Sequence, residues 1–289
     1  MQWRSLWWKI KKILKLKIDG PFFNSAFNII FKRRKLVEHL YFEVIGACQY
    51  NCTSCSHEEL RFQFRSFQLS IEEIKNFLHF TEKSNYHIHR LEIHGPGEPL
   101  LWKGFNDGVK MLKESGRISK IIVITNGLLL KNIKDETWKY IFQLRISLYP
   151  MSDILGSIKE KQKKFGRKIK VNKIDQFDRV PEERHENTTP CQCACPGPMF
   201  LKDRIILFCG PPGIHAAKLA GVDIINDPEM SEALGVNYLS RLDQNKIGKL
   251  KICEYCWANC NIKKEDIPVV SVKPNRVAAA NSEVKQVAS

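Results

Sequence analysis

Three cysteines within eight residues are the strongest chemical signal in this chain. Cys48, Cys52 and Cys55 follow an apolar run, residues 40–45, that has the aromatic and β-branched content of a buried strand. A closed zinc site takes four ligands, often in C-x2-C pairs, whereas three thiolates leave one iron of a cubane cluster open to a substrate or cofactor. Two other interpretations stay open: a zinc site completed by His57, or three unrelated buried cysteines.

A glycine-rich turn with one acid is the second candidate. Gly95-Pro96-Gly97-Glu98-Pro99 follows a strand-like segment, residues 90–94. Glycine allows the backbone to approach a ligand, and the Glu98 carboxylate can pair with a ligand ammonium group. The alternative is an ordinary loop with a solvated glutamate.

Together, the cysteine spacing and the glycine-rich turn resemble the radical S-adenosylmethionine (SAM) superfamily. In that superfamily a C-x3-C-x2-C loop holds a 4Fe–4S cluster whose open iron chelates SAM, and a GGEP motif binds the methionyl amino group. This chain departs from GGEP at Pro96, where the first glycine should stand. It also has Ser54 where many members carry an aromatic residue.

The resemblance assigns roles to particular residues. It implies that Cys48, Cys52 and Cys55 bind the SAM cluster. It further implies SAM contacts from residues in or after successive strands: Gly97, Glu98, Asn126 and Ser147. The adenine contact stays unassigned between Tyr50 and His57. Without the resemblance, Asn126-Gly127 is an ordinary turn signal and a serine in a strand has no special role.

The other seven cysteines lie in the C-terminal part of the chain and resemble the auxiliary-cluster region called SPASM, or its shorter twitch form. Residues 199–208 are the expected hairpin of that region. The implied ligands of an auxiliary 4Fe–4S cluster are Cys195, Cys209, Cys253 and Cys256, with Cys191, Cys193 and Cys260 as alternatives. Zinc remains the other interpretation here, because C-x2-C pairs also serve it.

Alternating strand and helix patterns predict an α/β fold, a partial (β/α)6 radical SAM barrel with a small Cys-rich twitch-like extension. A capping box at Ser70 opens the first predicted helix. Further helices are expected at residues 102–115, 135–142 and 152–165, and further strands at 120–125, 145–149 and 167–172. The predicted regions are a basic amphipathic segment (1–37), the barrel core (38–185), the auxiliary-cluster domain (186–265) and a disordered tail (266–289).

The chain is strongly basic, with a net charge of +15 from 46 Lys and Arg against 31 Asp and Glu. This balance favours anionic partners, but net charge alone does not identify which one. Residues 1–18 form a Trp-rich basic amphipathic pattern, which predicts either an interfacial membrane helix or a helix packed on the barrel. Clustered cysteines and the lack of a signal-peptide pattern predict a cytoplasmic protein, peripheral at the inner membrane face if residues 1–18 bind lipid.

The resemblance implies an enzyme in which a reduced cluster cleaves SAM and the resulting 5′-deoxyadenosyl radical abstracts a substrate hydrogen. We expect a two-electron oxidation or rearrangement of a sugar, alcohol or peptide side chain, with flavodoxin or ferredoxin as reductant. The alternatives are a peptide-modifying (RiPP or sulfatase-type) radical SAM maturase and a zinc-ribbon nucleic-acid-binding protein. We expect no specific nucleic-acid partner, and no motif in the sequence identifies the substrate or the oligomeric state.

Overall fold

The structure, a computed structural model, describes residues 34–52, 55, 64–150, 153–174, 176–178, 197–201, 204–208, 217, 218, 220–223, 226, 231–233, 269–271 and 274–276. The chain divides into two compact units, Met1–Leu36 and Val37–Ser289, and the architecture below is that of the second. Several predictions fall outside the described residues: the N-terminal helix at 1–18, His57, and the auxiliary ligands Cys191, Cys193, Cys195, Cys209, Cys253, Cys256 and Cys260.

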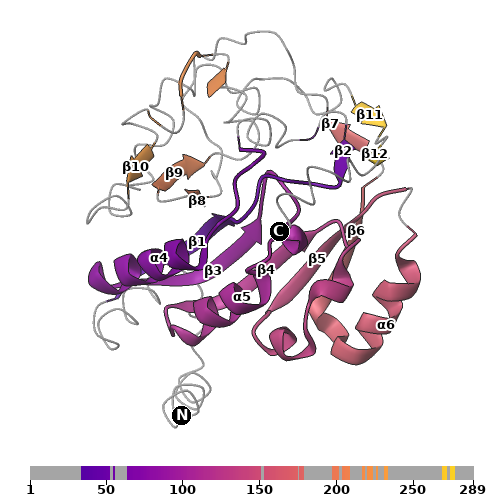
Figure 1. The fold of residues 1–289 in the computed structure, drawn as a ribbon, viewed down its shortest axis with the longest axis horizontal. Coiled ribbons are helices and arrows are strands. Elements are labelled where there is room, and N and C mark those ends of the chain that lie inside the picture. Colours follow the sequence, from indigo (N-terminus) through magenta and orange to yellow (C-terminus); the bar gives the residue numbers. More distant parts are fainter. Residues whose placement is uncertain are drawn as a thin grey trace, which may run out of the picture. The chain divides into compact units, whose positions relative to one another are not determined.

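A parallel sheet of six strands organises this unit, in the order β8-β1-β3-β4-β5-β6 (Figure 1). The strands are β1 (Lys35–Glu43), β3 (Tyr86–His94), β4 (Ile118–Thr125), β5 (Gln143–Leu148), β6 (Ile169–Lys173) and β8 (Gly197–Leu201). Two antiparallel strands, β9 (Arg204–Phe208) and β10 (Ser231–Ala233), extend the β8 edge. The predicted α/β fold is confirmed, and six parallel strands fit a partial barrel.

The sixth parallel strand comes from an unexpected place in the sequence. The hairpin expected at residues 199–208 is present as β8 and β9, paired from Gly197 with Phe208 to Leu201 with Arg204. However, β8 also pairs parallel with β1, in the register Tyr41 with Met199. The hairpin assigned to the auxiliary-cluster region therefore extends the main sheet.

Three α-helices follow strands of the sheet: α4 (Ile71–Lys83), α5 (Phe105–Glu114) and α6 (Leu155–Phe165). They lie on one face of the sheet (Figure 1), as right-handed crossovers between strands added in one direction require. The predicted capping box is present, since Ser70 Oγ accepts from Glu73 N and the Glu73 carboxylate accepts from Ser70 N. It stabilises the start of α4 after the cysteine loop.

The helix predicted at residues 135–142 is shorter than expected. It is a 3-10 helix, η3 (Asp135–Lys139), and similar turns occur at η1 (Pro99–Leu101), η2 (Leu130–Asn132) and η4 (Gly166–Lys168). Phe142 N already donates to Ile121 O at 2.8 Å, so the chain has to leave the helix and begin pairing with β4. Sheet pairing overrides the local helical pattern here.

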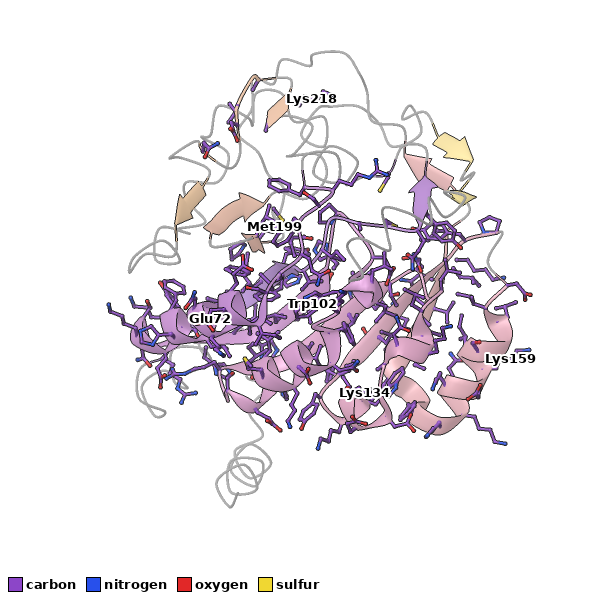
Figure 2. The ribbon with its side chains drawn as sticks, viewed as in Figure 1. Glu72, Trp102, Lys134, Lys159, Met199 and Lys218 are labelled. Atoms are coloured by element: carbon purple, nitrogen blue, oxygen red, sulfur yellow. The ribbon has the colours of Figure 1, made fainter. Side chains whose placement is uncertain are left out.

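Alternate residues of the strands form two different faces. The face toward the helices is apolar and fully buried, and Phe42 of β1 packs against Phe77 of α4 with ring centroids 5.0 Å apart. Trp102 and Met199 lie within the packed side chains, whereas Lys134 and Lys159 lie at the periphery (Figure 2). The opposite face, called the inner face below, is polar in its centre.

Two short strand pairs lie apart from the main sheet. β2 (Tyr50–Cys52) pairs antiparallel with β12 (Pro274–Arg276), and β7 (Gln176–Asp178) pairs antiparallel with β11 (Val269–Ser271). The tail for which we expected disorder therefore contains two strands. Three-residue strands that form by backbone pairing with distant segments leave too short a pattern for sequence periodicity to reveal.

One structural observation concerns whether the chain could span a membrane. No helix within the described ranges is both long and apolar enough to cross a bilayer.

Candidate cofactor site

The cysteine loop, residues 46–55, begins just beyond the carboxyl end of β1. Cys52 is buried in β2, and Cys48 and Cys55 are half-buried. Tyr50 N donates to Cys48 Sγ at 3.4 Å, and Cys55 N donates to Cys52 O at 3.3 Å. An amide N–H directed at sulfur favours the thiolate form that an iron ligand requires.

The glycine-rich loop after β3 is hydrogen-bonded directly to the cysteine loop. Gly97 N donates to Ile45 O at 3.0 Å, and Glu98 N donates to Ala47 O at 2.7 Å. A Cβ on Gly97 would lie 2.2 Å from Ala47 O and 2.6 Å from Gly46 C. We expected glycine in this turn to let the backbone approach a ligand. In the structure, Gly97 instead lets the turn approach the backbone of the cysteine loop, and only glycine allows this contact.

The Glu98 carboxylate joins the same loop to the end of β4. Its Oε1 accepts from Leu100 N at 3.0 Å and from Thr125 Oγ1 at 2.5 Å, and its Oε2 accepts from Asn126 N at 2.8 Å. Burial raises the pKa of Glu98, and these hydrogen bonds oppose that rise. A carboxylate has roughly four acceptor positions, so about one remains for a ligand ammonium group.

Asn126 connects the third loop of the site to the cysteine loop. Its Nδ2 donates to Gln49 Oε1 at 3.2 Å, and its Oδ1 accepts from Leu128 N at 3.0 Å. Gln49 was not among the predicted site residues, because a glutamine in a loop gives no distinctive signal. The loops after β1, β3 and β4 are thus bonded into one unit.

Tyr149, immediately after β5, is a site residue that the sequence did not reveal. Burial raises its pKa, and the negative charges of Cys52, Cys55, Cys48 and Glu98 raise it further, so all four groups are close enough to act on this phenol electrostatically. Its ring lies 5.4 Å from that of Tyr50, nearly perpendicular to it. Ser147, half-buried in β5, is on the same side of the strand because it lies two residues earlier.

The donor set fits an iron–sulfur cluster with three protein thiolates. Cys48, Cys52 and Cys55 all raise the pKa of Tyr149, and the loop that carries them is hydrogen-bonded to the other two loops. Among the residues that the structure describes, no three His, Cys, Asp or Glu side chains lie close enough together to hold a single metal ion. In a cubane cluster each thiolate binds a different iron, so the three sulfurs do not have to converge on one metal ion.

Two acid–histidine pairs on the inner face lie beside this site. Glu43 Oε1 lies 3.3 Å from His94 Nδ1, and Glu92 Oε2 lies 3.5 Å from His39 Nε2 and 3.2 Å from Arg145 Nη1. Burial raises the pKa of Glu43 well above its ordinary value. The sequence signal that could have found these residues is charge at alternate positions of strands expected to be apolar on both faces.

Glu43→Gln is expected to stabilise the fold increasingly as the pH rises above 4.5, the ordinary pKa of the carboxyl group. The native state holds the Glu43 proton more tightly than the unfolded chain, so wild-type stability falls as the pH rises toward the raised pKa. Glutamine resembles the protonated acid and cannot ionise. The melting temperature of the variant, minus that of wild type, should increase with pH.

Glu82→Gln is the control for the loss of a carboxylate, because it makes the same substitution at an exposed position. A melting-temperature difference for Glu43→Gln that does not change with pH would show that Glu43 ionises as it does in the unfolded chain.

The fold and the site define an α/β protein with a candidate cofactor site built from the loops that follow parallel strands, where ligands bind in such sheets. No family model matches the sequence. A GTP 3',8-cyclase of Tolumonas auensis (strain DSM 9187 / NBRC 110442 / TA 4) is 26% identical over 174 residues, 53% of this chain and 50% of the relative. The chain thus spans about half the length of this relative.

Solved structures are also similar. A crystal structure of BtrN in complex with AdoMet and 2-DOIA has a TM-score of 0.49 and 15% identity, covering 78% of this chain and 94% of that chain. Streptococcus suis SuiB bound to precursor peptide SuiA has a TM-score of 0.38 and 17% identity, covering 57% of this chain and 43% of that chain.

Proposed function

We propose that this protein is a radical SAM enzyme. One observation carries the proposal: hydrogen bonds join the cysteine loop, the loop of the buried Glu98 and the turn at Asn126 into one unit, and the three cysteines and Glu98 all raise the pKa of Tyr149. In this proposal the three cysteines hold a 4Fe–4S cluster that, when bound, supplies the electron for SAM cleavage.

The neighbouring side chains then have defined tasks in SAM binding. Glu98 uses its remaining acceptor position for the methionyl ammonium group, and Gly97 keeps the two loops close enough for the cluster and SAM to share one site. Asn126 and Ser147 offer polar groups to the methionyl and ribose parts. Tyr50, packed on Tyr149, lines the adenine side and excludes water.

The net reaction proposed is a two-electron oxidation or rearrangement of a sugar, alcohol or peptide side chain. The twitch-like region would hold an auxiliary 4Fe–4S cluster through Cys195, Cys209, Cys253 and Cys256, and Cys191, Cys193 and Cys260 are the alternative ligands. Flavodoxin or ferredoxin would supply electrons. The C-x2-C pair and the hairpin before Cys209 support this part of the proposal.

Anaerobic reconstitution of the full chain tests the proposal. We expect roughly eight irons, with matching acid-labile sulfide, for two cubane clusters, or four for the SAM cluster alone. The reduced protein should convert SAM into 5′-deoxyadenosine and methionine. Bound zinc without sulfide, or an iron-loaded protein that leaves SAM intact, would exclude the proposed enzyme.

A further inference from the structure

The inner face of the sheet carries a group of six polar side chains that the cofactor site does not use. We call it the inner-face cluster, and its members come from β1, β3 and β5: His39, Tyr41, Glu43, Glu92, His94 and Arg145. Parallel sheets are normally apolar on both faces. A cluster of buried ionisable groups in this position costs stability and is characteristic of a functional surface.

The cluster is arranged around two acids. Glu92, 6% exposed, lies between His39 and Arg145 at 3.5 and 3.2 Å, and Glu43, fully buried, lies beside His94 at 3.3 Å. The ring of Tyr41 contacts both histidine rings, with centroids 4.3 and 4.8 Å away. Burial and the charge of Glu92 raise the pKa of Tyr41 to about 12, so the phenol keeps its proton at neutral pH.

Glu43 has an unusual environment for a buried acid. Although Oε1 lies 3.3 Å from His94 Nδ1, neither carboxyl oxygen has a contact with hydrogen-bond geometry within the part of the chain that the structure describes. A buried polar atom without a hydrogen bond costs about 1–3 kcal/mol, so such atoms commonly mark a missing ligand or water. Glu43 therefore gives independent support for a polar ligand at this face.

The cluster adjoins the cofactor loops. Glu43 is the last residue of β1 and lies three positions before the start of the cysteine loop, and His94 is the last residue of β3, immediately before the glycine-rich loop. A Cβ on Gly95 would lie 3.2 Å from Glu43 Oε2. Arg145 and Ser147 share one side of β5, and Tyr149, at the next alternate position, follows directly after the strand, so the cluster leads toward the site of the three cysteines.

We propose that the inner-face cluster binds the substrate and selects a neutral small molecule that carries adjacent hydroxyl groups. This inference rests on the proposed radical SAM function and narrows its substrate class. Carboxylates, imidazoles, a phenol and a guanidinium provide donors and acceptors side by side, which is the pattern that neighbouring hydroxyls require. Ile122 and Ile124 of β4 lie on the same face between β3 and β5 and offer an apolar surface to the C–H side of a ring.

Charge argues against the other substrate classes. The whole chain carries +15, but within the cluster Arg145 is paired with Glu92 at 3.2 Å, and Arg90 is the other arginine close enough to lower the pKa of Tyr41. A phosphorylated substrate would therefore bring its dianion close to the Glu92 carboxylate and compete with it for Arg145, which is unfavourable at short range. Extended peptides commonly bind by adding to the edge of a sheet, whereas this cluster lies on interior strands, β1, β3 and β5.

Saturation-transfer NMR on the reconstituted, SAM-loaded protein tests the inference with four probes: myo-inositol, D-glucose, D-glucose 6-phosphate and the peptide Gly-Ser-Gly. We expect myo-inositol or glucose to bind more tightly than the other two. The dissociation constant of the bound polyol should rise at least about tenfold in Glu92→Gln and in Arg145→Gln. Each substitution breaks the contact between Glu92 and Arg145 and removes a charged group that would hydrogen-bond the hydroxyls.

Glu82→Gln is the matched control, since it breaks another Glu–Arg pair, Glu82–Arg117 at 3.5 Å, on the exposed surface. Polyol binding should be unchanged in that variant. Arg145 is 29% exposed, so Arg145→Gln keeps the test valid if Glu92→Gln does not fold. Preferred binding of the phosphate or the peptide, no binding of either polyol, or an equal loss in Glu82→Gln would overturn the inference. Wild-type SAM cleavage without any probe tests the proposed function separately.

Discussion

Cys52→Ala is expected to abolish SAM cleavage, reducing 5′-deoxyadenosine formation by at least about a thousandfold. A three-thiolate site that loses one thiolate cannot hold the cubane in place, and Cys52 is the buried member, fixed in β2. The reconstituted variant should lose most of the iron of the SAM cluster. Iron and sulfide analysis, together with chromatography of SAM products under reducing conditions, measures both effects.

Cys253→Ala is the comparison variant, because it removes a cysteine of the C-x2-C pair assigned to the auxiliary cluster. It should retain SAM cleavage and lose substrate turnover. Wild-type production of 5′-deoxyadenosine by Cys52→Ala would show that the cluster lies elsewhere.

Gly97→Ala is expected to separate the cysteine loop from the glycine-rich loop. The new methyl group would lie 2.2 Å from Ala47 O, against backbone that no side-chain rotation can move. Relieving that overlap breaks the bonds from Gly97 N to Ile45 O and from Glu98 N to Ala47 O. We expect a loss of about 1–3 kcal/mol in stability and at least tenfold weaker SAM binding.

Gly156→Ala in α6 provides the matched control for this substitution. A Cβ at position 156 meets nothing within 4 Å, and alanine is favoured over glycine in a helix by about 1 kcal/mol. Calorimetry and SAM titration should show an unchanged or slightly more stable protein. If Gly97→Ala matched this control in both measurements, the steric role of Gly97 would be refuted.

The chemical loops could be predicted from the sequence because their signals are local. Three spaced cysteines, the glycine-rich turn with Glu98, and the Asn126-Gly127 turn each follow an apolar run, and strand ends of a parallel sheet meet at one edge. The capping box at Ser70 could be predicted for the same reason, since its two partners lie three residues apart.

The contacts between distant segments left no such signal. Tyr149 belongs to the site because β5 ends beside the cysteines, and nothing in its neighbours in sequence indicates this. Glu92 and Arg145 meet across the inner face although 53 residues separate them. The two-faced character of the sheet becomes evident only when the register of β3, β4 and β5 is known.

The pairing of β2 with β12 has a consequence for the order of events in the cell. The cysteine loop is made early in synthesis, but the strand that pairs with Cys52, Asn51 and Tyr50 ends at residue 276. The ribosome must therefore complete residue 276, and that segment must leave the exit tunnel, before the edge of β2 gains its partner. We expect iron and sulfide to enter this loop as a late step of maturation, after the parallel sheet beneath it has formed.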